Sequence, residues 1–376
     1  MPDIALIAAT TRFAFKLYSQ VVGQNRDVNV FLSPASVALA LAMAYNGAVG
    51  ETRQAIAAAL ELGELDPEEV NHAAGAVLQE LEHLDPRARL AIANSLWVNQ
   101  DVILEPAFVE RNREVYRAEL AGLNFADPRS VAVINAWVRE HTHGKIERII
   151  EQIDASAILF LINAIYFKGD WTWQFDRKQT RDAPFTLLDG RQKLHPMMRQ
   201  SGSYPYYEGD GFQAISLPYG AGRLSMYIFL PAPRSSLDAL NRHLGSTRWN
   251  TWMRRFRKTE GSIALPRFKL EYEVTLNEAL KALGMGVAFD PRRADFSAMC
   301  AHTAQKVYLN EVRHKTFVEV NEEGTEAAAV TSAGMVLAAF TPSRSFHMVV
   351  DRPFFCAIRD NQTGLILFMG AIVEPQ

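Results

Sequence analysis

The sequence predicts an α+β protein in which helices pack on large mixed or antiparallel sheets. Signals for helix starts gather in the first part of the chain, and strand-like runs follow. Residues 158–167 form a nearly continuous apolar run, rich in β-branched and aromatic side chains, which suits a strand buried on both faces. Residues 212–218 and 223–230 flank Tyr219-Gly220-Ala221-Gly222, which is typical of a hairpin. Since no repeat, linker or change in composition divides the chain, we expect a single domain over residues 1–376.

Each predicted helix near the N-terminus begins with a capping side chain followed by proline. The three starts are Ser33-Pro34, Asp66-Pro67 and Asp127-Pro128. The first precedes the apolar run 37–44, and the second helix should extend to about Leu81. The third carries one apolar face, formed by Ile134, Trp137 and Val138. Much later, residues 307–320 predict a long strand that leads directly to residue 322.

Composition and charge narrow the classes of function. A hydrophobic fraction of 48% and a charged fraction of 22% are those of a soluble folded protein. The net charge is only −3, so we expect no basic patch, no nucleic-acid partner and no membrane. The longest apolar run, residues 365–373, is too short to span a bilayer. The two cysteines, Cys300 and Cys356, are expected to be unpaired buried thiols.

The N-terminus, Met1-Pro2-Asp3-Ile4, lacks a basic region followed by an apolar core. No signal peptide is therefore visible, and we expect either a cytoplasmic protein or the mature form of a secreted one.

The sequence gives little indication of an enzyme or of a metal-binding protein. There is no Gly-x-Ser-x-Gly motif, no Cys-x-x-Cys and no His-Glu-x-x-His, so we expect neither a catalytic residue nor a metal site nor a cofactor. His141 and His143 form an i, i+2 pair at a predicted helix end. Such a pair points about 200° apart on a helix, so joint ligation of one metal ion is not expected.

The most informative segment covers residues 322–333, because its side chains alternate in kind. With a period of two, one face would carry small uncharged residues: Thr325, Ala327, Ala329, Thr331 and Ala333. The other face would carry Glu326, Ala328, Val330 and Ser332. An exposed loop that must later become a buried strand needs this arrangement, because no charge is then carried inside. Gly324 precedes the small residues and, without a Cβ, can serve as a pivot.

This segment resembles the hinge of the serpins, a family of suicide inhibitors of proteases. The family pattern Glu-x-Gly-Thr-Glu-Ala-Ala-x-x-Thr is matched throughout by Glu322, Glu323, Gly324, Thr325, Glu326, Ala327, Ala328, Ala329, Val330 and Thr331. Further family-like blocks follow in the family's order: Asn29-Val30-Phe31-Leu32-Ser33-Pro34, Asn163-Ala164-Ile165-Tyr166-Phe167-Lys168-Gly169-Asp170-Trp171, Leu265-Pro266-Arg267-Phe268, His314-Lys315, Asp351-Arg352-Pro353-Phe354 and Leu367-Phe368-Met369-Gly370. The resemblance covers essentially the whole chain.

The resemblance implies a serpin fold with an exposed reactive-centre loop at about residues 322–345. It also implies a shutter, where the main sheet parts, formed by Ser33, Ser36, Asn163 and His314. From the residues alone, Ser33 would be a helix cap and His314 a satisfied core histidine. The breach, where insertion starts, is matched by Trp171, Arg267 and Glu322. An Arg267–Glu322 ion pair there would tether the hinge, although an exposed pair would contribute little.

The implied partner is a serine protease, which would be held in a covalent acyl complex. The resemblance also implies that the protein is not an enzyme and that it acts as a monomer. The family's spacing from Glu322 places the bait bond at Ala338–Ala339, and a hinge one residue shorter would place it at Leu337–Ala338. Residues 335–340 contain no Arg or Lys, which favours elastase-, subtilisin- or chymotrypsin-like targets. A non-inhibitory serpin that carries a ligand or acts as a chaperone is the competing expectation.

Heparin is not expected as a partner through the helix that binds it in some serpins. The corresponding segment carries no Lys or Arg and four glutamates: Glu68, Glu69, Glu80 and Glu82.

Overall fold

The structure of the chain, a computed structural model, describes residues 4–82, 84–85, 87–300, 306–325 and 345–376. The α-helices of these residues are α1 (Ile4–Gln24), α2 (Pro34–Gly47), α3 (Gly50–Ala59), α4 (Pro67–Glu82), α5 (Pro106–Tyr116), α6 (Arg129–His141), α7 (Leu237–His243), α8 (Ser246–Met253) and α9 (Asn277–Ala282). Two 3₁₀ turns are η1 (Arg177–Gln179) and η2 (Met285–Phe289).

The strands form two sheets. The six-stranded sheet has the order β10 (Phe268–Thr275), β11 (Glu311–Val320), β12 (Gly324–Thr325), β4 (Leu159–Asp170), β2 (Ala88–Asn99) and β3 (Glu119–Leu123). The nine-stranded sheet has the order β1 (Val30–Leu32), β15 (Ile366–Ile372), β14 (Phe354–Asp360), β8 (Leu224–Pro231), β7 (Phe212–Pro218), β6 (Gln192–Gly209), β9 (Arg257–Pro266) and β13 (Phe346–Val349), and β5 (Arg181–Thr186) pairs with β6.

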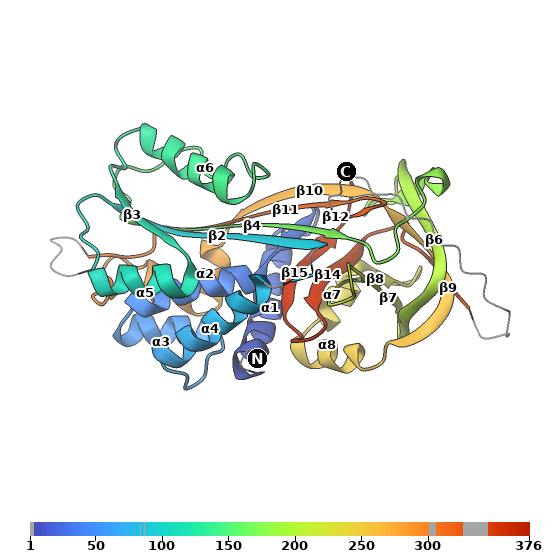
Figure 1. Cartoon of the computed structure of the whole chain (residues 1–376), viewed down its shortest axis with the longest axis horizontal. Coiled ribbons are helices and arrows are strands. Elements are labelled where there is room, and N and C mark those ends of the chain that lie inside the picture. The colour runs from blue at the N-terminus through green and yellow to red at the C-terminus, as the bar shows by residue number, and fades with distance from the viewer. Residues whose placement is uncertain (1–3, 83, 86, 301–305, 326–344) are drawn as a thin grey trace.

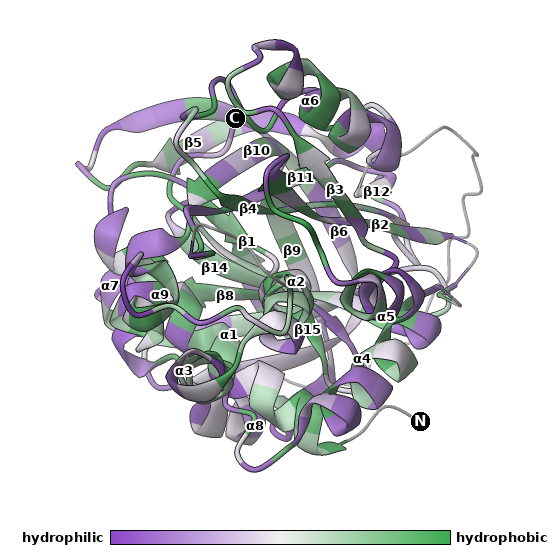
Figure 2. Ribbon diagram, turned by 90° about the vertical axis from the view of Figure 1, so that its left-hand side faces the viewer, coloured by the Kyte–Doolittle hydropathy of each residue, from purple (hydrophilic) through white to green (hydrophobic). Residues whose placement is uncertain are grey.

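Helices cover the six-stranded sheet on both faces. In Figure 1, α6 lies above this sheet, whereas α1 to α5 lie below it, beside the second sheet. The larger hydrophobic core joins α1, α2 and both sheets, and a smaller core lies between α6 and the outer face of the six-stranded sheet. Helix α2 is buried along nearly its whole length and occupies the centre of the view in Figure 2.

The helix-start signals of α2 and α4 and the hairpin are confirmed, whereas α6 begins at Arg129 with Pro128 as its N-cap and without the predicted side-chain cap. Helix α2 has Ser33 as its N-cap and proline in its first turn, and α4 ends one residue beyond the predicted Leu81. Helix α6 buries Ile134 and Val138, while Trp137 is half-buried. Strand β4 extends the predicted run 158–167 and is buried on both faces, and β7 and β8 form the predicted hairpin.

Two expectations were wrong in detail. The long strand predicted at 307–320 begins only at Glu311, because the preceding backbone bonds elsewhere: Leu309 N–H donates to Ala288 O and Asn310 N–H to Leu159 O. The order of helices before strands also fails, since α7, α8 and α9 lie between strands of the second half.

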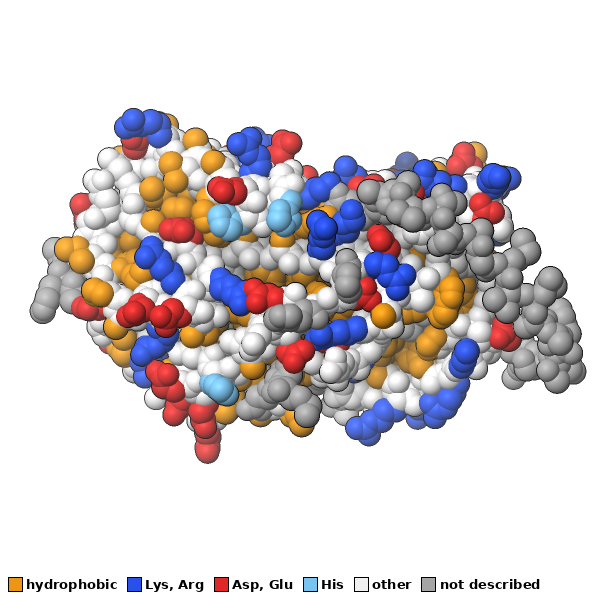
Figure 3. All heavy atoms as spheres, viewed as in Figure 1, with side chains coloured by type: hydrophobic (Ala, Val, Ile, Leu, Met, Phe, Trp, Pro, Cys, Tyr) orange, Lys and Arg blue, Asp and Glu red, His pale blue; other side chains and the backbone are white. Residues whose placement is uncertain are grey.

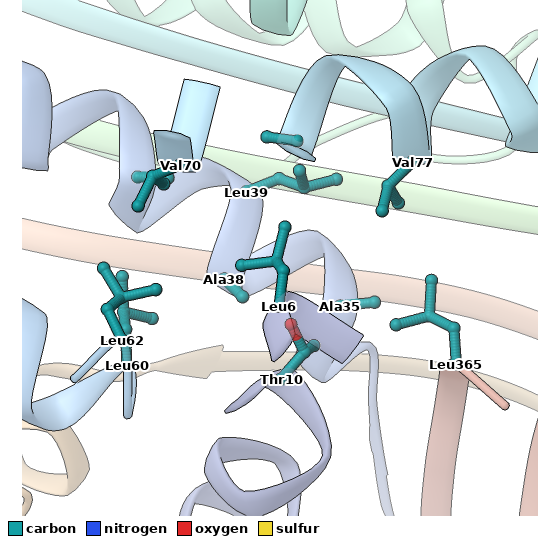
Figure 4. A pocket seen from close by; sticks show the side chains of 12 residues that line it. Leu6, Thr10, Ala35, Ala38, Leu39, Leu60, Leu62, Val70, Val77 and Leu365 are labelled. Atoms are coloured by element: carbon teal, nitrogen blue, oxygen red, sulfur yellow. The ribbon is translucent and has the colours of Figure 1, made fainter. Parts of the chain in front are cut away.

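A small apolar cavity lies between α1, α2 and α4 (Figure 4). Its volume is about 30 Å³, and side chains such as Leu6, Leu39 and Val77 point into it. This is the space of about one water molecule, so the cavity is a packing gap rather than a ligand pocket. Cys300 and Cys356 are buried and form no disulfide, as expected. Within the described part of the chain, no helix has the length and apolar character that crossing a membrane requires.

Candidate functional site

The centre of the six-stranded sheet is a seam between β4 and β11. These strands pair directly and in parallel from Glu311 beside Phe160 to Phe317 beside Tyr166. Beyond that point the two strands separate, and the short strand β12 lies between them (Figure 1). The seam is therefore closed over seven residue pairs, and we call this part its lower end. At the opposite end, which we call the upper end, it already holds a third strand.

Strand β12 pairs antiparallel with both neighbours. Thr325 lies opposite Gly169 of β4 and opposite Val320 of β11. Gly169 and Val320 are 151 positions apart, and the same offset separates Phe160 from Glu311 in the closed part of the seam. A strand that continued β12 downward would consequently stay in register with β4 and β11 at the same time.

Gly324 stands where β12 comes closest to β4. A Cβ added at this position would lie 2.1 Å from the carbonyl oxygen of Gly169 and 2.6 Å from the Cα of Asp170. Both neighbours are backbone atoms, which cannot swing away as a flexible side chain could. Position 324 therefore requires glycine for steric reasons.

The four predicted shutter residues meet in the closed part of the seam. Asn163 and His314 are paired neighbours on β4 and β11, and Ser33 and Ser36 lie at the start of α2 beneath them. Asn163 Nδ2 donates to Ser36 Oγ at 2.5 Å, and all four side chains are at most 1% exposed. Ser33 Oγ also accepts from Ser36 N–H at 3.4 Å, so the role as helix cap is present as well.

Hydrogen bonds assign the tautomer of His314. Its Nε2 accepts from the backbone N–H of Ser33 at 2.9 Å, so the proton lies on Nδ1, which donates to Asn163 Oδ1 at 2.6 Å. Burial lowers the pKa of His314 to about 3, although the bond to Asn163 opposes this shift. The imidazole is thus neutral near pH 7, and the shutter contains no charge.

The predicted breach pair is formed at the upper end. Arg267 Nε donates to Glu322 Oε1 at 2.8 Å, and Thr180 Oγ1 donates to the same oxygen at 2.5 Å. The Glu322 side chain is only 2% exposed, while that of Arg267 is 42% exposed, so the pair is not the fully exposed kind that would contribute little. Burial alone would raise the pKa of the Glu322 carboxyl, but the bonds from Arg267 and Thr180 outweigh it and hold this pKa below its ordinary value.

Trp171, the third predicted breach residue, holds the backbone just before β12. Its Nε1 donates to Asn321 O at 2.9 Å, and its backbone N–H donates to Glu323 O at 2.9 Å. The indole stacks on Tyr219 with ring centroids 4.4 Å apart and planes 10° apart. The Tyr219 hydroxyl in turn lies 2.7 Å from Thr325 Oγ1, which is fully buried.

Sequence reasoning missed several partners of these residues. Glu323 forms an ion pair with Arg177, which lies on η1, and its side chain is 10% exposed. Asn94 of β2 accepts from Asn163 Nδ2 at 2.5 Å and so joins the shutter. Arg177, Thr180 and Tyr219 lie far from residue 322 in sequence, and only Asn94 carries a signal, as an amide in a mainly apolar strand.

The remaining predicted positions lie outside the described residues. These are the hinge residues Glu326, Ala327, Ala328, Ala329, Val330 and Thr331 and the bait positions Leu337, Ala338 and Ala339.

Comparisons with known proteins agree with this geometry. The family model described as Serpin (serine protease inhibitor) matches residues 8–375. The chain belongs to the serpin family. It is 37% identical to Serpin B8 of Bos taurus over 99% of this chain and 100% of the relative, and 35% identical to the leukocyte elastase inhibitor of Sus scrofa over 98% and 99%.

Among solved structures, the native state of the thermophilic serpin tengpin matches with a TM-score of 0.93 and 31% identity, covering 100% of this chain and 95% of tengpin. The serpin fold expected from the sequence is thereby confirmed. Another similar structure is thyroxine-binding globulin in complex with thyroxine, with a TM-score of 0.88 and 25% identity over 98% of this chain and 99% of the other.

Proposed function

We propose that this serpin is a suicide inhibitor of serine proteases, in which the cleaved loop inserts between β4 and β11. Membership of a family described as serine protease inhibitors supports protease inhibition in general. The mechanism rests on the register of β12. A strand that continued β12 would stay in register with β4 and with β11 at the same time. A hinge of small residues follows β12 in the sequence.

In the proposed inserted state the loop would run antiparallel to both β4 and β11. Each later residue of the loop would therefore lie beside the preceding residue of each strand. Thr331 follows Thr325 by six residues, so it would lie between Asn163 and His314, which are six residues before Gly169 and about the same distance before Val320. The Thr331 hydroxyl can both donate and accept a hydrogen bond, so it could bond to Asn163 and to His314 after these two residues have separated. Ala327 and Ala329 would likewise lie beside the bulky Phe167 and Ile165, where a small side chain is needed.

The chemistry requires no catalytic group of the inhibitor. The protease serine Oγ attacks the carbonyl carbon of the bait residue, an ester forms, and the peptide C–N bond breaks. The new amine of the following residue takes up a proton and stays with the C-terminal segment, whose strands β13, β14 and β15 belong to the nine-stranded sheet. Insertion of about 15 residues at roughly 3.3 Å each would then carry the attached protease about 50 Å along the sheet. Inhibition follows if insertion is faster than hydrolysis of the ester.

We place the bait bond at Ala338–Ala339, with Leu337–Ala338 as the alternative. The absence of Arg and Lys from residues 335–340 supports elastase-, subtilisin- or chymotrypsin-like targets. The partner is thus a protease, and the inhibitor would act as a monomer. Heparin is not expected to bind through α4, because this helix carries four glutamates and no Lys or Arg.

A carrier function without insertion is the alternative, since the fold is shared with a thyroxine-binding protein. Such a protein would tolerate bulky or charged residues in the hinge, whereas residues 327–329 here are all alanine. The test is to mix the full chain with a panel of trypsin-, chymotrypsin-, elastase- and subtilisin-like proteases. A complex that survives SDS with at least one of the last three supports the proposal. Cleavage without any stable complex would contradict it.

The bait bond is tested by mass spectrometry of the released C-terminal fragment. A fragment that begins at Ala339 supports the first bond, and one that begins at Ala338 supports the second. The substitution Ala338→Arg should add inhibition of trypsin-like enzymes, because it supplies the charge that their specificity pocket requires. A fragment that begins elsewhere would disprove the register counted from Glu322.

A further inference from the structure

A basic patch lies at the corner where α8 ends and β9 begins, contrary to the expectation of none. Residues 239–259 contain no Asp or Glu, and six of them are basic: Arg242, Arg248, Arg254, Arg255, Arg257 and Lys258. The whole chain carries −3, so the residues outside this group of +6 carry −9. Net charge alone concealed this local excess of positive charge.

The basic side chains of this patch are exposed and largely unneutralised. All six residues are exposed, and blue side chains gather at the lower right of the molecule in Figure 3, near α8 and β9 in Figure 1. Arg242 pairs with Asp238 at 3.5 Å, whereas none of the other five forms an ion pair with any described residue. Nearby carboxylates do exist at Glu208, Asp210 and Glu260, but they face solvent without approaching these cations closely enough to pair.

Two of the arginines are held in place by the fold. Arg255 Nη1 donates to the Tyr207 hydroxyl at 3.1 Å, and its guanidinium lies over the Tyr207 ring. Arg257 Nη1 donates to the carbonyl oxygens of Arg254 and Phe256 at 2.7 and 2.8 Å. These contacts use only part of each guanidinium, so the remaining N–H groups can bind a carboxylate without a large loss of side-chain entropy.

The patch adjoins the place where the reactive loop rejoins the sheet. Strand β13 pairs with β9 from Phe346 beside Gly261, and Lys258 is only three residues before Gly261, or roughly 10 Å along the strand. Phe346 stacks on Tyr206, with ring centroids 4.2 Å apart, and Tyr206 is the strand partner of Arg257. The end of the loop and the basic corner therefore share one rigid support.

We propose that this corner is an exosite for the target protease, which binds an acidic surface beside the protease's active-site cleft. The inference rests on the proposed function, because a protease that attacks the loop must come close to the point where the loop ends. The cations would raise the rate of encounter rather than the strength of the final covalent complex, since charges at the rim of an interface act mainly on association. An acidic protease would be selected over a basic one with the same bait preference.

A free polyanion is the weaker candidate for this surface. Phosphate or sulfate polymers could also bind these arginines. Binding a polymer, however, does not require the basic patch to lie beside the loop. Continuity with the β9–β13 support favours a partner that engages both.

The experiment reverses two cations that have no side-chain partner among the described residues, Arg254→Glu together with Lys258→Glu. The matched control reverses two exposed arginines away from the loop, Arg139→Glu on α6 together with Arg292→Glu after η2. Association rate constants and stoichiometry of inhibition are measured with two proteases of equal bait preference, one with an acidic and one with a basic surface around its cleft. Each is measured at about 0.05 M and 0.5 M salt.

We expect the corner variant to slow association with the acidic protease about tenfold at low salt and less than twofold at high salt. Association with the basic protease should not slow, and the control should change neither rate more than twofold. The yield of SDS-stable complex should stay the same in every variant, and its absence even from the unaltered chain would instead disprove the proposed function. Equal slowing by the corner and control variants, or loss of binding to polyphosphate without a change in either rate, would overturn the exosite.

Discussion

The two ends of the β4–β11 seam are held by different forces. At the lower end the strands bond directly to each other, and the side chains beneath them form a neutral network around His314. At the upper end β12 separates the strands, and two carboxylates of the hinge are tied to Arg267 and Arg177. Hydrogen bonds between neutral groups exchange partners at modest net cost, whereas an ion pair with a buried carboxylate leaves an uncompensated charge when it breaks.

This difference suggests a division of labour along one seam. Under the proposed mechanism, the ionic end would fix where the hinge sits before cleavage and would thus set the register of the residues that follow it. The neutral end would part and then bond to a new strand, and no charge would have to be moved through the core.

The first prediction concerns the inward face of the hinge. Thr325 is fully buried in the intact chain and would stay buried after insertion, so Thr325→Arg would place a charge in the core in both states. We expect cleavage of the loop to continue while the covalent complex falls by at least about tenfold, as judged by SDS gels. Glu326→Arg is the control, because the alternation of the sequence places residue 326 on the opposite face. Undiminished complex with Thr325→Arg would refute insertion in this register.

The second prediction concerns the seam as a whole. Cleavage of the loop should raise the melting temperature by roughly 13 °C, because insertion would give a net gain of about ten backbone hydrogen bonds at about 1 kcal/mol each, after the loss of the direct bonds between β4 and β11. Calorimetry of the intact and the loop-cleaved chain measures the difference. A cleaved form that melts at or below the intact form would show that the seam does not accept a strand.

The sequence allowed the fold and the composition of both ends to be predicted, but not how they are held. Ser33, Ser36, Asn163 and His314 could be grouped because the family resemblance joins them, and they do meet. Arg177 could not be predicted, because an arginine in a polar loop gives no sign of which carboxylate it faces. The basic corner was missed for a related reason: net charge averages over the chain and hides a local excess.

The third prediction concerns the neutral end. Asn163→Ala removes the acceptor of His314 Nδ1–H and leaves this buried donor unsatisfied, which costs about 1–3 kcal/mol in addition to the lost bonds to Ser36 and Asn94. We expect the free energy of unfolding in urea to fall by about 3 kcal/mol. The exposed Asn250→Ala serves as the control and should change it by less than about 0.5 kcal/mol. An equal effect of the two substitutions would mean that the shutter network does not hold the seam.

The fourth prediction uses pH to test the same end. The folded pKa of His314 is about 3, below the ordinary value of 6.5, so the unfolded chain binds one more proton between these values. The contribution of His314 is complete above pH 6.5 and is lost as the pH falls towards 3. Between pH 6.5 and 5 this group alone should cost about 2 kcal/mol. Unfolding at both pH values is compared for the unaltered chain and for His314→Gln, which should lose this part of the slope, and for His72→Gln at an exposed position, which should keep it.

The fifth and smallest effect is expected at the ionic end. Glu322→Gln keeps an oxygen that can accept from Arg267 and Thr180 but removes the charge, so we expect the free energy of unfolding at pH 7 to fall by about 1 kcal/mol. The folded pKa of Glu322 lies below its ordinary value of 4.5, so its charge stabilises the fold above that value and loses this effect as the pH falls through the folded pKa. The difference between the two proteins should therefore shrink on acidification.

Glu110→Gln, at an exposed position on α5, is the control and should have little effect at either pH. If the upper end fixes the hinge, Glu322→Gln should also increase hydrogen exchange at the Thr325 amide more than at the His314 amide, because only the former belongs to β12. Equal increases at both amides would mean that the two ends open together. The contrast between an ionic and a neutral end would then describe composition alone and not the order in which the seam parts.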